Sequence, residues 1–161
     1  LIEKLLARFG ECDYEYAALA IGGSAASMGV NGYPDGLDAE CCAFDALERS
    51  WREATEQPDR EHVTQYVQRK GLFRCGLLVP DHDYSALRLT VDEPEDLELA
   101  RRLFEELYVE ADHPFSFEDV LRVLSERPDL VGLNRQFVGK EKYRDLWEAR
   151  AGHPEHHMEE S

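Results

Sequence analysis

Apolar side chains recur along this chain in two patterns, each typical of one kind of secondary structure. In residues 1–10 the apolar side chains are three and four positions apart, as they are on one face of an amphipathic helix. Short runs rich in apolar and aromatic residues are instead typical of buried strands. The predicted strands are 14–21, 37–44, 72–79 and 86–91, and the predicted helices are 1–10, 45–55, 61–69, 94–108, 116–126 and about 140–149.

The order of these elements predicts an α/β fold, with most strands in the middle of the chain and most helices at its end. Residues 22–36 contain five glycines and one proline, which predicts a long loop. Loops of that length inside a compact domain are usually functional or disordered. In the helix predicted over 45–55, Phe44, Leu47 and Trp51 share one face, and Pro58 should end it.

The net charge of the chain limits the classes of molecule that it is expected to bind. The 161 residues include 34 acidic and 18 basic side chains, a formal net charge of −16. Such a field repels phosphate backbones and anionic membrane surfaces, so we expect neither nucleic acid nor membrane as a partner. No apolar run approaches the roughly 18 residues that a membrane span needs. The four cysteines form no Cys-x-x-Cys pair and are expected to be buried thiols of a cytoplasmic protein.

The segment Arg-Leu-Thr-Val-Asp-Glu-Pro-Glu-Asp-Leu at 88–97 holds the first candidate functional residue. A predicted strand ends at Val91 and a predicted helix follows at once, so Asp92 lies at the carboxyl end of a strand. Open α/β sheets bind their ligands at that edge. Asp92 and Glu95 also have the spacing of a helix capping box, and from this segment alone capping is the simpler interpretation.

Two further segments carry candidate binding residues. Tyr-Pro-Asp-Gly at 33–36 predicts a turn, and strand alternation after it would put Asp38 and Glu40 on one face. Two carboxylates on one face can bind sugar hydroxyls or a hydrated cation, or they can simply face solvent. His62, flanked by Arg60 and Glu61, could be a general base or contact a substrate, although a single His near a helix start is more often a capping or packing residue.

Taken together and in order, these segments resemble the cytidylyltransferases related to spore-coat polysaccharide biosynthesis and to acylneuraminate and ulosonate activation. The resemblance covers about residues 1–137. The matching stretches are Tyr-Pro-Asp-Gly-Leu-Asp-Ala-Glu at 33–40, Phe-Asp-Ala-Leu-Glu-Arg-Ser-Trp-Arg-Glu-Ala at 44–54, Arg-Glu-His-Val-Thr at 60–64, Leu-Arg-Leu-Thr-Val-Asp-Glu-Pro-Glu-Asp-Leu at 87–97 and Phe-Ser-Phe-Glu-Asp-Val-Leu at 115–121.

The resemblance implies a fold and an activity. The family fold is a nucleotide-diphospho-sugar transferase-like α/β sandwich, and this chain would be its C-terminal portion, ending in a helical segment. Family members transfer CMP from CTP to a sugar or sugar acid with Mg²⁺, in the synthesis of surface polysaccharides. Asp92 would be a metal ligand. Asp38, Glu40, Glu61 and His62 would contact the sugar.

The resemblance also implies an organisation of the chain. Residues 1–137 would be the C-terminal part of the transferase domain. Beyond the resemblance, the sequence pattern itself predicts a C-terminal helix at 138–151 and a disordered polar tail at 152–161. The family's glycine-containing basic loop for the triphosphate has no counterpart in this sequence, and the predicted first helix has no capping residue before it. We therefore expect the chain to be part of a longer protein, to be inactive alone, and to allow a homodimer. The alternative hypothesis is a non-catalytic acidic protein-interaction domain.

Overall fold

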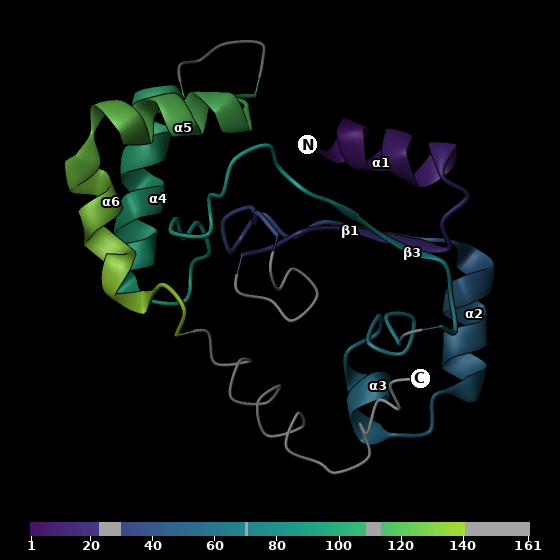
Figure 1. Cartoon of the computed structure of the whole chain (residues 1–161). Helices are drawn as coiled ribbons and strands as arrows, with labels where there is room; N and C mark the ends of the chain where they lie inside the picture. The colour runs from purple at the N-terminus through teal and green to yellow at the C-terminus, as the bar shows by residue number, and fades with distance from the viewer. Residues whose placement is uncertain (23–29, 70, 109–113, 141–161) are drawn as a thin grey trace, which may run out of the picture.

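The computed structural model describes residues 1–22, 30–69, 71–108 and 114–140. Within them a small sheet lies beside a group of helices, so the fold is mixed α/β, as expected (Figure 1). Parts of the predicted loop 22–36, nearly all of the helix predicted near 140–149 and the whole tail 152–161 lie outside the described residues.

The sheet has three strands in the order β2-β1-β3. The central strand β1 (Tyr16–Leu19) is buried along its whole length. Strand β2 (Glu40–Cys42) pairs with it antiparallel, with Ala18 opposite Glu40, and β3 (Cys75–Leu78) pairs with it parallel. A strand that is apolar on both faces needs cover on both, and the neighbouring helices provide it.

Each face of the sheet has its own apolar cluster. Helix α1 (Ile2–Glu11) inserts Leu5 against Ala17 and Leu19 on one face. On the other face, helix α2 (Phe44–Glu53) and the segment after it pack against Tyr16 and Ala18. Helix α3 (Gln57–Glu61) lies on the α2 side (Figure 1). The alternation of β1 therefore divides its side chains between two cores.

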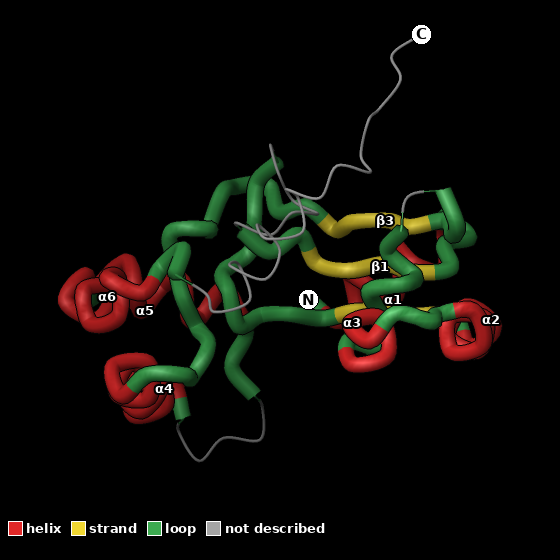
Figure 2. Tube along the Cα trace, turned by 90° about the horizontal axis from the view of Figure 1, so that it is seen from below, coloured by secondary structure: helices red, strands yellow, loops and turns green. Residues whose placement is uncertain are grey.

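The remaining helices form a third apolar cluster. Helix α4 (Pro94–Leu107), α5 (Phe117–Glu126) and α6 (Pro128–Asn134) pack on one another, and the short 3₁₀ helix η2 (Arg135–Phe137) follows. Figure 2 shows α4, α5 and α6 together at one side of the sheet. None of the helices in the described ranges is both long and apolar enough to cross a lipid bilayer.

Two predicted elements are wrong. Residues 86–91 form no strand; they make one isolated bridge, between Arg88 and Asp35, because the side chain of Arg88 turns into an ionic cluster. The helix predicted over 61–69 is absent: α3 ends at Glu61, and Pro58 lies in its first turn instead of ending α2. The chain then follows turns that bury Tyr66 and Val67 in the core.

Smaller differences concern lengths and thiols. The three strands are shorter than predicted, and α6 was not anticipated. The cysteines are free but not fully buried: Cys12, Cys41 and Cys42 are half-buried and Cys75 is exposed. Although the residue is exposed, the thiol of Cys75 donates to the carbonyl of Val67 at 3.3 Å and is partly buried.

Candidate functional site

The side chain of Arg88 is the centre of the most connected polar cluster among the described residues. The side chain is only 4% exposed, and its guanidinium group contacts three carboxylates. Nη1 donates to Asp35 Oδ2 at 3.0 Å, Nη2 to Asp92 Oδ2 at 2.9 Å, and Nε to Asp96 Oδ1 at 3.0 Å. We call this set, Arg88 with Asp35, Asp92 and Asp96, the Arg88 clamp.

Asp96 anchors the clamp from the first turn of α4. Its Oδ2 accepts hydrogen bonds from the backbone N–H groups of Asp92 and Glu93, at 3.1 and 3.0 Å. Asn134 of α6 donates to Asp96 Oδ1 at 2.8 Å and to the carbonyl of Arg88 at 3.0 Å. Burial alone would raise the pKa of Asp96, but the hydrogen bonds from Arg88, from Asn134 and from the two backbone N–H groups outweigh it and lower that pKa to about 2. Asp96 is therefore a charged anchor at neutral pH.

The Tyr-Pro-Asp-Gly turn lies directly on the clamp segment. The N–H of Leu89 donates to the carbonyl of Asp35 at 2.7 Å. Gly36 has φ of +98°, and a Cβ there would lie 2.3 Å from the nitrogen of Thr90. Only glycine allows this close approach, so the turn at 33–36 and the segment at 88–90 are held as one unit.

Asp92 is the exposed member of the clamp, with 58% of its side chain accessible. Its Oδ2 accepts from Arg88 and, at 3.2 Å, from Thr90 Oγ1. The capping interpretation of Asp92 is wrong: the N-cap of α4 is Glu93, and Asp96 is the acidic residue that caps it. The helix begins one residue later than the predicted capping box requires, so Asp92 precedes it.

The clamp has an excess of negative charge. One guanidinium group faces three carboxylates, so two negative charges remain unbalanced. A divalent cation has the charge and the oxygen preference that would balance them. In the part of the chain that the structure describes, no three His, Cys, Asp or Glu side chains converge to hold a metal ion by themselves. A cation at Asp92 would thus take most of its ligands from water or from a substrate.

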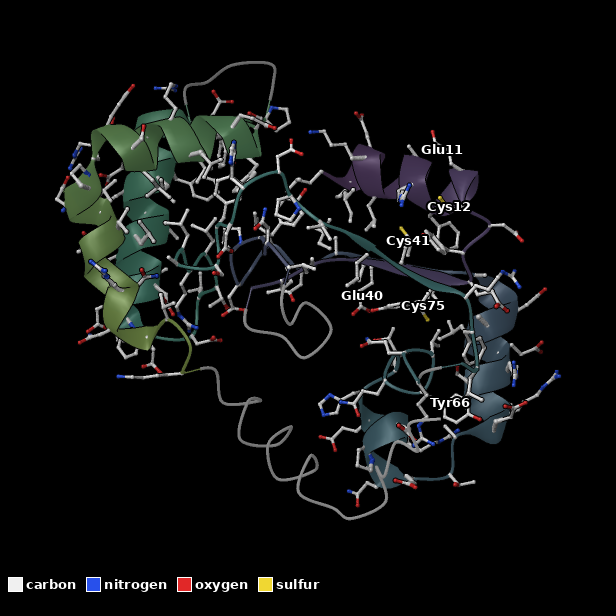
Figure 3. All side chains as sticks on the ribbon, in the orientation of Figure 1. Glu11, Cys12, Glu40, Cys41, Tyr66 and Cys75 are labelled. Atoms are coloured by element: carbon white, nitrogen blue, oxygen red, sulfur yellow. The ribbon has the colours of Figure 1, made fainter. Side chains whose placement is uncertain are left out.

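A second polar cluster surrounds the buried hydroxyl of Tyr16 beneath the sheet. Burial raises the pKa of this hydroxyl, and the neighbouring Glu40 carboxylate raises it further by charge and by a hydrogen bond. Gln68 Nε2 donates to the same hydroxyl at 2.9 Å, and Thr64 also bonds to it. Figure 3 shows Glu40 on the side of the sheet that faces Tyr66, and Cys41 on the side of α1. Tyr16 thus brings the segments 33–40 and 60–64 together.

The other predicted sugar contacts are exposed. Asp38 accepts from the N–H of Gly36 at 3.2 Å, next to the clamp. It precedes β2, so strand alternation does not place it beside Glu40. Glu61 and His62 end α3, which lies far from α4 in both Figure 1 and Figure 2. The structure therefore brings Asp38 near the Asp92 segment and leaves Glu61 and His62 at another part of the molecule.

Sequence reasoning missed four members of the site: Arg88, Asp35, Asp96 and Asn134. Asp35 had been explained by turn chemistry alone. A buried arginine opposite several acidic residues gives no periodic signal, because its partners are 4, 8 and 53 positions away. The arginine four residues before Asp92 was the one local clue, since this spacing also allows an ion pair.

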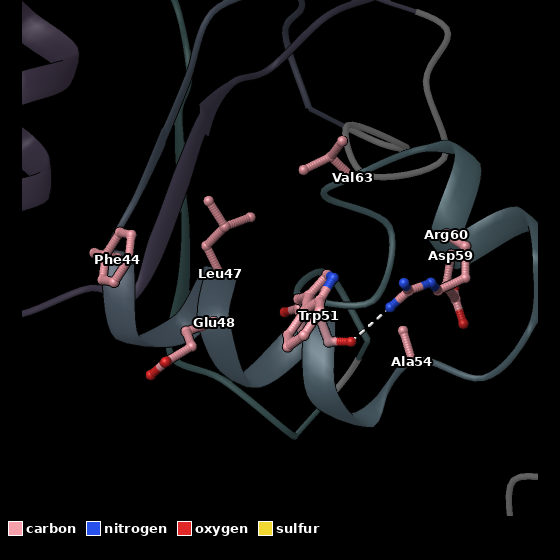
Figure 4. Close-up of a pocket in the computed structure, with 9 residues that line it drawn as sticks. Phe44, Leu47, Glu48, Trp51, Ala54, Asp59, Arg60 and Val63 are labelled. Carbon is pink, nitrogen blue, oxygen red and sulfur yellow. Dashed lines mark hydrogen bonds between the residues drawn. The ribbon is translucent and has the colours of Figure 1, made fainter.

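A cavity of 610 Å³ lies between α2 and α3. Phe44, Leu47 and Trp51 of α2 line it, together with Arg60 and Val63 (Figure 4). Its walls are mostly apolar, in contrast to the Arg88 clamp. We call it the α2 groove.

Comparison with known proteins supports the fold. No protein-family model matches the chain. Its fold is similar to that of a cytidylyltransferase from Leptospira borgpetersenii serovar Hardjo-bovis, with a TM-score of 0.66, 21% sequence identity, and coverage of 81% of this chain and 51% of that one. The mixed sheet and its helices are therefore those of a cytidylyltransferase-like fold.

A sequence relative extends the comparison. The chain is 31% identical over 121 residues to the uncharacterized protein MJ1063 of Methanocaldococcus jannaschii, a match that covers 70% of this chain and 46% of that protein. The chain thus spans about half the length of both proteins.

Proposed function

We propose that this chain is part of an Mg²⁺-dependent nucleotidyltransferase that transfers CMP from CTP to a sugar or sugar acid. The observation that carries the proposal is the Arg88 clamp: it joins two of the sequence segments that resemble the cytidylyltransferases, 33–36 and 88–96, at an exposed carboxylate. The likeness of the fold to that of a cytidylyltransferase supports the same family. The whole fold would be the α/β sandwich of these enzymes.

In this proposal Asp92 is a ligand of Mg²⁺. Both of its hydrogen bonds in the described region use Oδ2, so Oδ1 is the oxygen that it presents to a cation. Arg88 and Thr90 hold the carboxylate in place, and Asp96 holds its backbone N–H. Bound Mg²⁺ would neutralise charge on the phosphates of CTP. This chain contributes a fixed anionic group to that arrangement.

The proposed reaction is an attack of a sugar oxygen on the α-phosphorus of CTP. The new oxygen–phosphorus bond replaces the bond to the β-phosphate, and pyrophosphate leaves with its electron pair. Asp38 is proposed to bind a sugar hydroxyl through its exposed carboxylate, and Glu40 through the carboxylate that is also bonded to the hydroxyl of Tyr16. Glu61 and His62 remain proposed contacts, and their place at the end of α3 requires an acceptor or a protein segment that extends to that helix.

The test is pyrophosphate release by the complete protein that contains this chain, because the chain spans only about half of its relatives. Release is measured with CTP, ATP, GTP or UTP as the nucleotide, each combined with a panel of sugars and sugar acids, with and without Mg²⁺. We expect release that depends on CTP, on Mg²⁺ and on the acceptor. Equal turnover with ATP or GTP would contradict the cytidylyl specificity, and turnover undiminished by chelation would contradict the role of the metal.

A further inference from the structure

Asn134 is a buried polar residue at the end of α6, and its side chain belongs to the surroundings of the Arg88 clamp. It is the last residue of the helix and is only 2% exposed. Its amide nitrogen Nδ2 donates to the carbonyl of Arg88 at 3.0 Å and to Oδ1 of Asp96 at 2.8 Å. A primary amide carries two N–H groups, so both donors of Asn134 are used. The amide therefore holds two groups of the clamp at once.

Hydrogen bonds link Asn134 to the exposed residue Asp92 by two routes. In the first, Asp96 accepts from Asn134 at Oδ1 and from the backbone N–H of Asp92 at Oδ2, the latter at 3.1 Å. In the second, Asp96 accepts from Arg88 Nε at 3.0 Å, and Arg88 Nη2 donates to Oδ2 of Asp92 at 2.9 Å. The backbone and the carboxylate of Asp92 are therefore both held through groups that Asn134 orients.

The space beside Asn134 leaves little room for water to replace its amide. A cavity of about 10 Å³ lies between residues 86–89 and the helices α4, α5 and α6. This volume is at the lower limit of what one water molecule occupies. The helices contribute mainly apolar side chains to its walls: Leu99, Leu124 and Val131. If the amide were removed, the carbonyl of Arg88 and the carboxylate of Asp96 would each lose a buried hydrogen-bond partner.

The position of Asn134 is set by the packing of the helices. Leu130 of the same helix is 3% exposed and packs in the apolar cluster of α4, α5 and α6. The amide is therefore attached to a support that the ionic contacts of the clamp do not themselves supply. Residues that orient a metal ligand from such a support typically change metal affinity by about 10–100-fold when they are replaced.

We propose that Asn134 is a positioning residue for the metal site: through Asp96 and Arg88 it fixes the carboxylate of Asp92, and so it sets the affinity of the complete protein for a divalent cation. This inference rests on the proposed function, in which Asp92 is a ligand of Mg²⁺. Asn134 itself contacts neither the metal nor the substrate. The helices α4, α5 and α6 thereby act on the site through one buried amide.

The first experiment measures metal binding in the absence of turnover. Mn²⁺, which shares the oxygen ligands of Mg²⁺, is titrated into the complete protein, and the free ion is measured by electron paramagnetic resonance. Asn134→Leu keeps the branched shape of the side chain and removes both donors, so it should raise the Mn²⁺ dissociation constant about tenfold or more. Asn134→Ser keeps one donor and leaves room for a water molecule. It should fold readily and raise the constant by a smaller factor.

Leu130→Ala is the matched control. Leu130 is similarly buried on the same helix but packs in the apolar cluster and is not part of the clamp. Its truncation leaves a cavity among the helices, so it should lower the stability to urea at least as far as Asn134→Ser does. The Mn²⁺ dissociation constant should nevertheless stay at the native value, because the hydrogen bonds that reach Asp92 are intact.

The second experiment measures pyrophosphate release as a function of Mg²⁺ concentration. In Asn134→Leu the carboxylate of Asp92 is still present, so the Mg²⁺ concentration that gives half of the maximal rate should rise by about the same factor as the Mn²⁺ dissociation constant. Saturating Mg²⁺ should restore most of the rate. In Asp92→Asn the ligand itself is missing, so added Mg²⁺ should not restore turnover.

The role of Asn134 and the proposed function can fail separately. If Asp92→Asn weakens Mn²⁺ binding but both Asn134 variants bind Mn²⁺ as the native protein does, Asp92 is a ligand and the positioning role of Asn134 is overturned alone. If Leu130→Ala weakens binding as much as Asn134→Leu, helix packing accounts for the effect and the positioning role is again wrong. If Asp92→Asn leaves Mn²⁺ binding unchanged, the proposed metal role fails and this inference fails with it.

Discussion

Arg88 shows how much of the candidate site depends on one side chain. Its planar guanidinium group donates in different directions to Asp35, Asp92 and Asp96. A lysine in its place would carry the charge but not the geometry, because an ammonium group cannot reproduce a fixed fork of donors. The pKa of Arg88 is raised, chiefly by its hydrogen bonds to Asp96, so it stays charged at any accessible pH. Asp92 is therefore held by a permanent cation.

At this scale we predict that Asp92→Asn separates catalysis from stability. The asparagine keeps the shape of the side chain but is a much weaker Mg²⁺ ligand. In the complete protein, turnover should fall at least about a hundredfold if Asp92 binds the metal. The free energy of unfolding should change by less than about 1 kcal/mol, because the pair with Arg88 is exposed on the Asp92 side.

Steady-state kinetics and urea unfolding measure the two effects. Glu95→Gln is the matched control, since Glu95 is a nearby carboxylate in the first turn of α4 that accepts a long hydrogen bond from Gln136, at 3.4 Å. It should leave both quantities nearly unchanged. Near-normal turnover of Asp92→Asn would show that Asp92 is not a metal ligand.

At the scale of elements, the residues of the turn at 33–36 are explained by the segment on which the turn packs. Turn chemistry accounts for proline and glycine in any tight turn. Here Asp35 also binds Arg88, and Gly36 lies against the backbone of Leu89 and Thr90. The turn that the sequence placed before a strand therefore also joins two parts of the chain that are distant in sequence, residues 33–36 and 88–90.

We predict that Gly36→Ala lowers the free energy of unfolding by at least about 2 kcal/mol, because it combines a positive φ with a backbone clash. Gly10→Ala is the matched control: Gly10 lies in α1, and a Cβ there meets nothing within 4 Å. That change should stabilise the chain by about 0.5–1 kcal/mol. The free energies of unfolding of the two variants are measured by urea titration, with circular dichroism as the signal. Equal effects of the two substitutions would contradict the close contact.

At the scale of the molecule, the clamp links two separately packed parts. One apolar cluster covers each face of the sheet, and another fills the space among α4, α5 and α6. Asp96 of α4 and Asn134 of α6 hold Arg88, and Arg88 holds the turn that follows β1. The buried ionic contacts are therefore a direct connection between the helices and the sheet.

This connection should weaken in acid. The pKa of Asp96 is about 2 in the folded chain against an ordinary value of 3.8, so its contribution is complete above about pH 4 and is lost as the pH falls toward 2. The difference corresponds to about 2 kcal/mol. We predict that the free energy of unfolding falls more steeply between pH 5 and 2 in the native chain than in Asp96→Asn, by about this amount.

The control for this measurement is Asp129→Asn. Asp129 also pairs with an arginine, Arg127, but on the surface, so its replacement should leave the steep acid dependence in place. Denaturant titrations at a series of pH values give the comparison. Parallel pH profiles for the native chain and Asp96→Asn would contradict a clamp that depends on the charge of Asp96.

The sequence by itself determined the elements whose signals are local. Periodic apolar residues predicted α1, α2, α4 and α5, and apolar runs located β1, β2 and β3, because burial of one face or of a whole strand leaves a regular pattern. The ordered segments at 33–40 and 87–97 predicted a cytidylyltransferase-like fold, which the structural comparison supports.

Only the tertiary structure decided how those segments meet. Residues 86–91 do not form the predicted strand, and α4 is capped by Glu93 and Asp96, not by Asp92. Arg88 is buried among carboxylates, and a pattern of apolar residues does not reveal such a contact. The outward face of α2 was likewise decided by packing: small Ala46 and Ser50 fit against the sheet, which leaves Phe44 and Trp51 outside. Helical periodicity shows that two faces exist, but the volume available inside selects which one is buried.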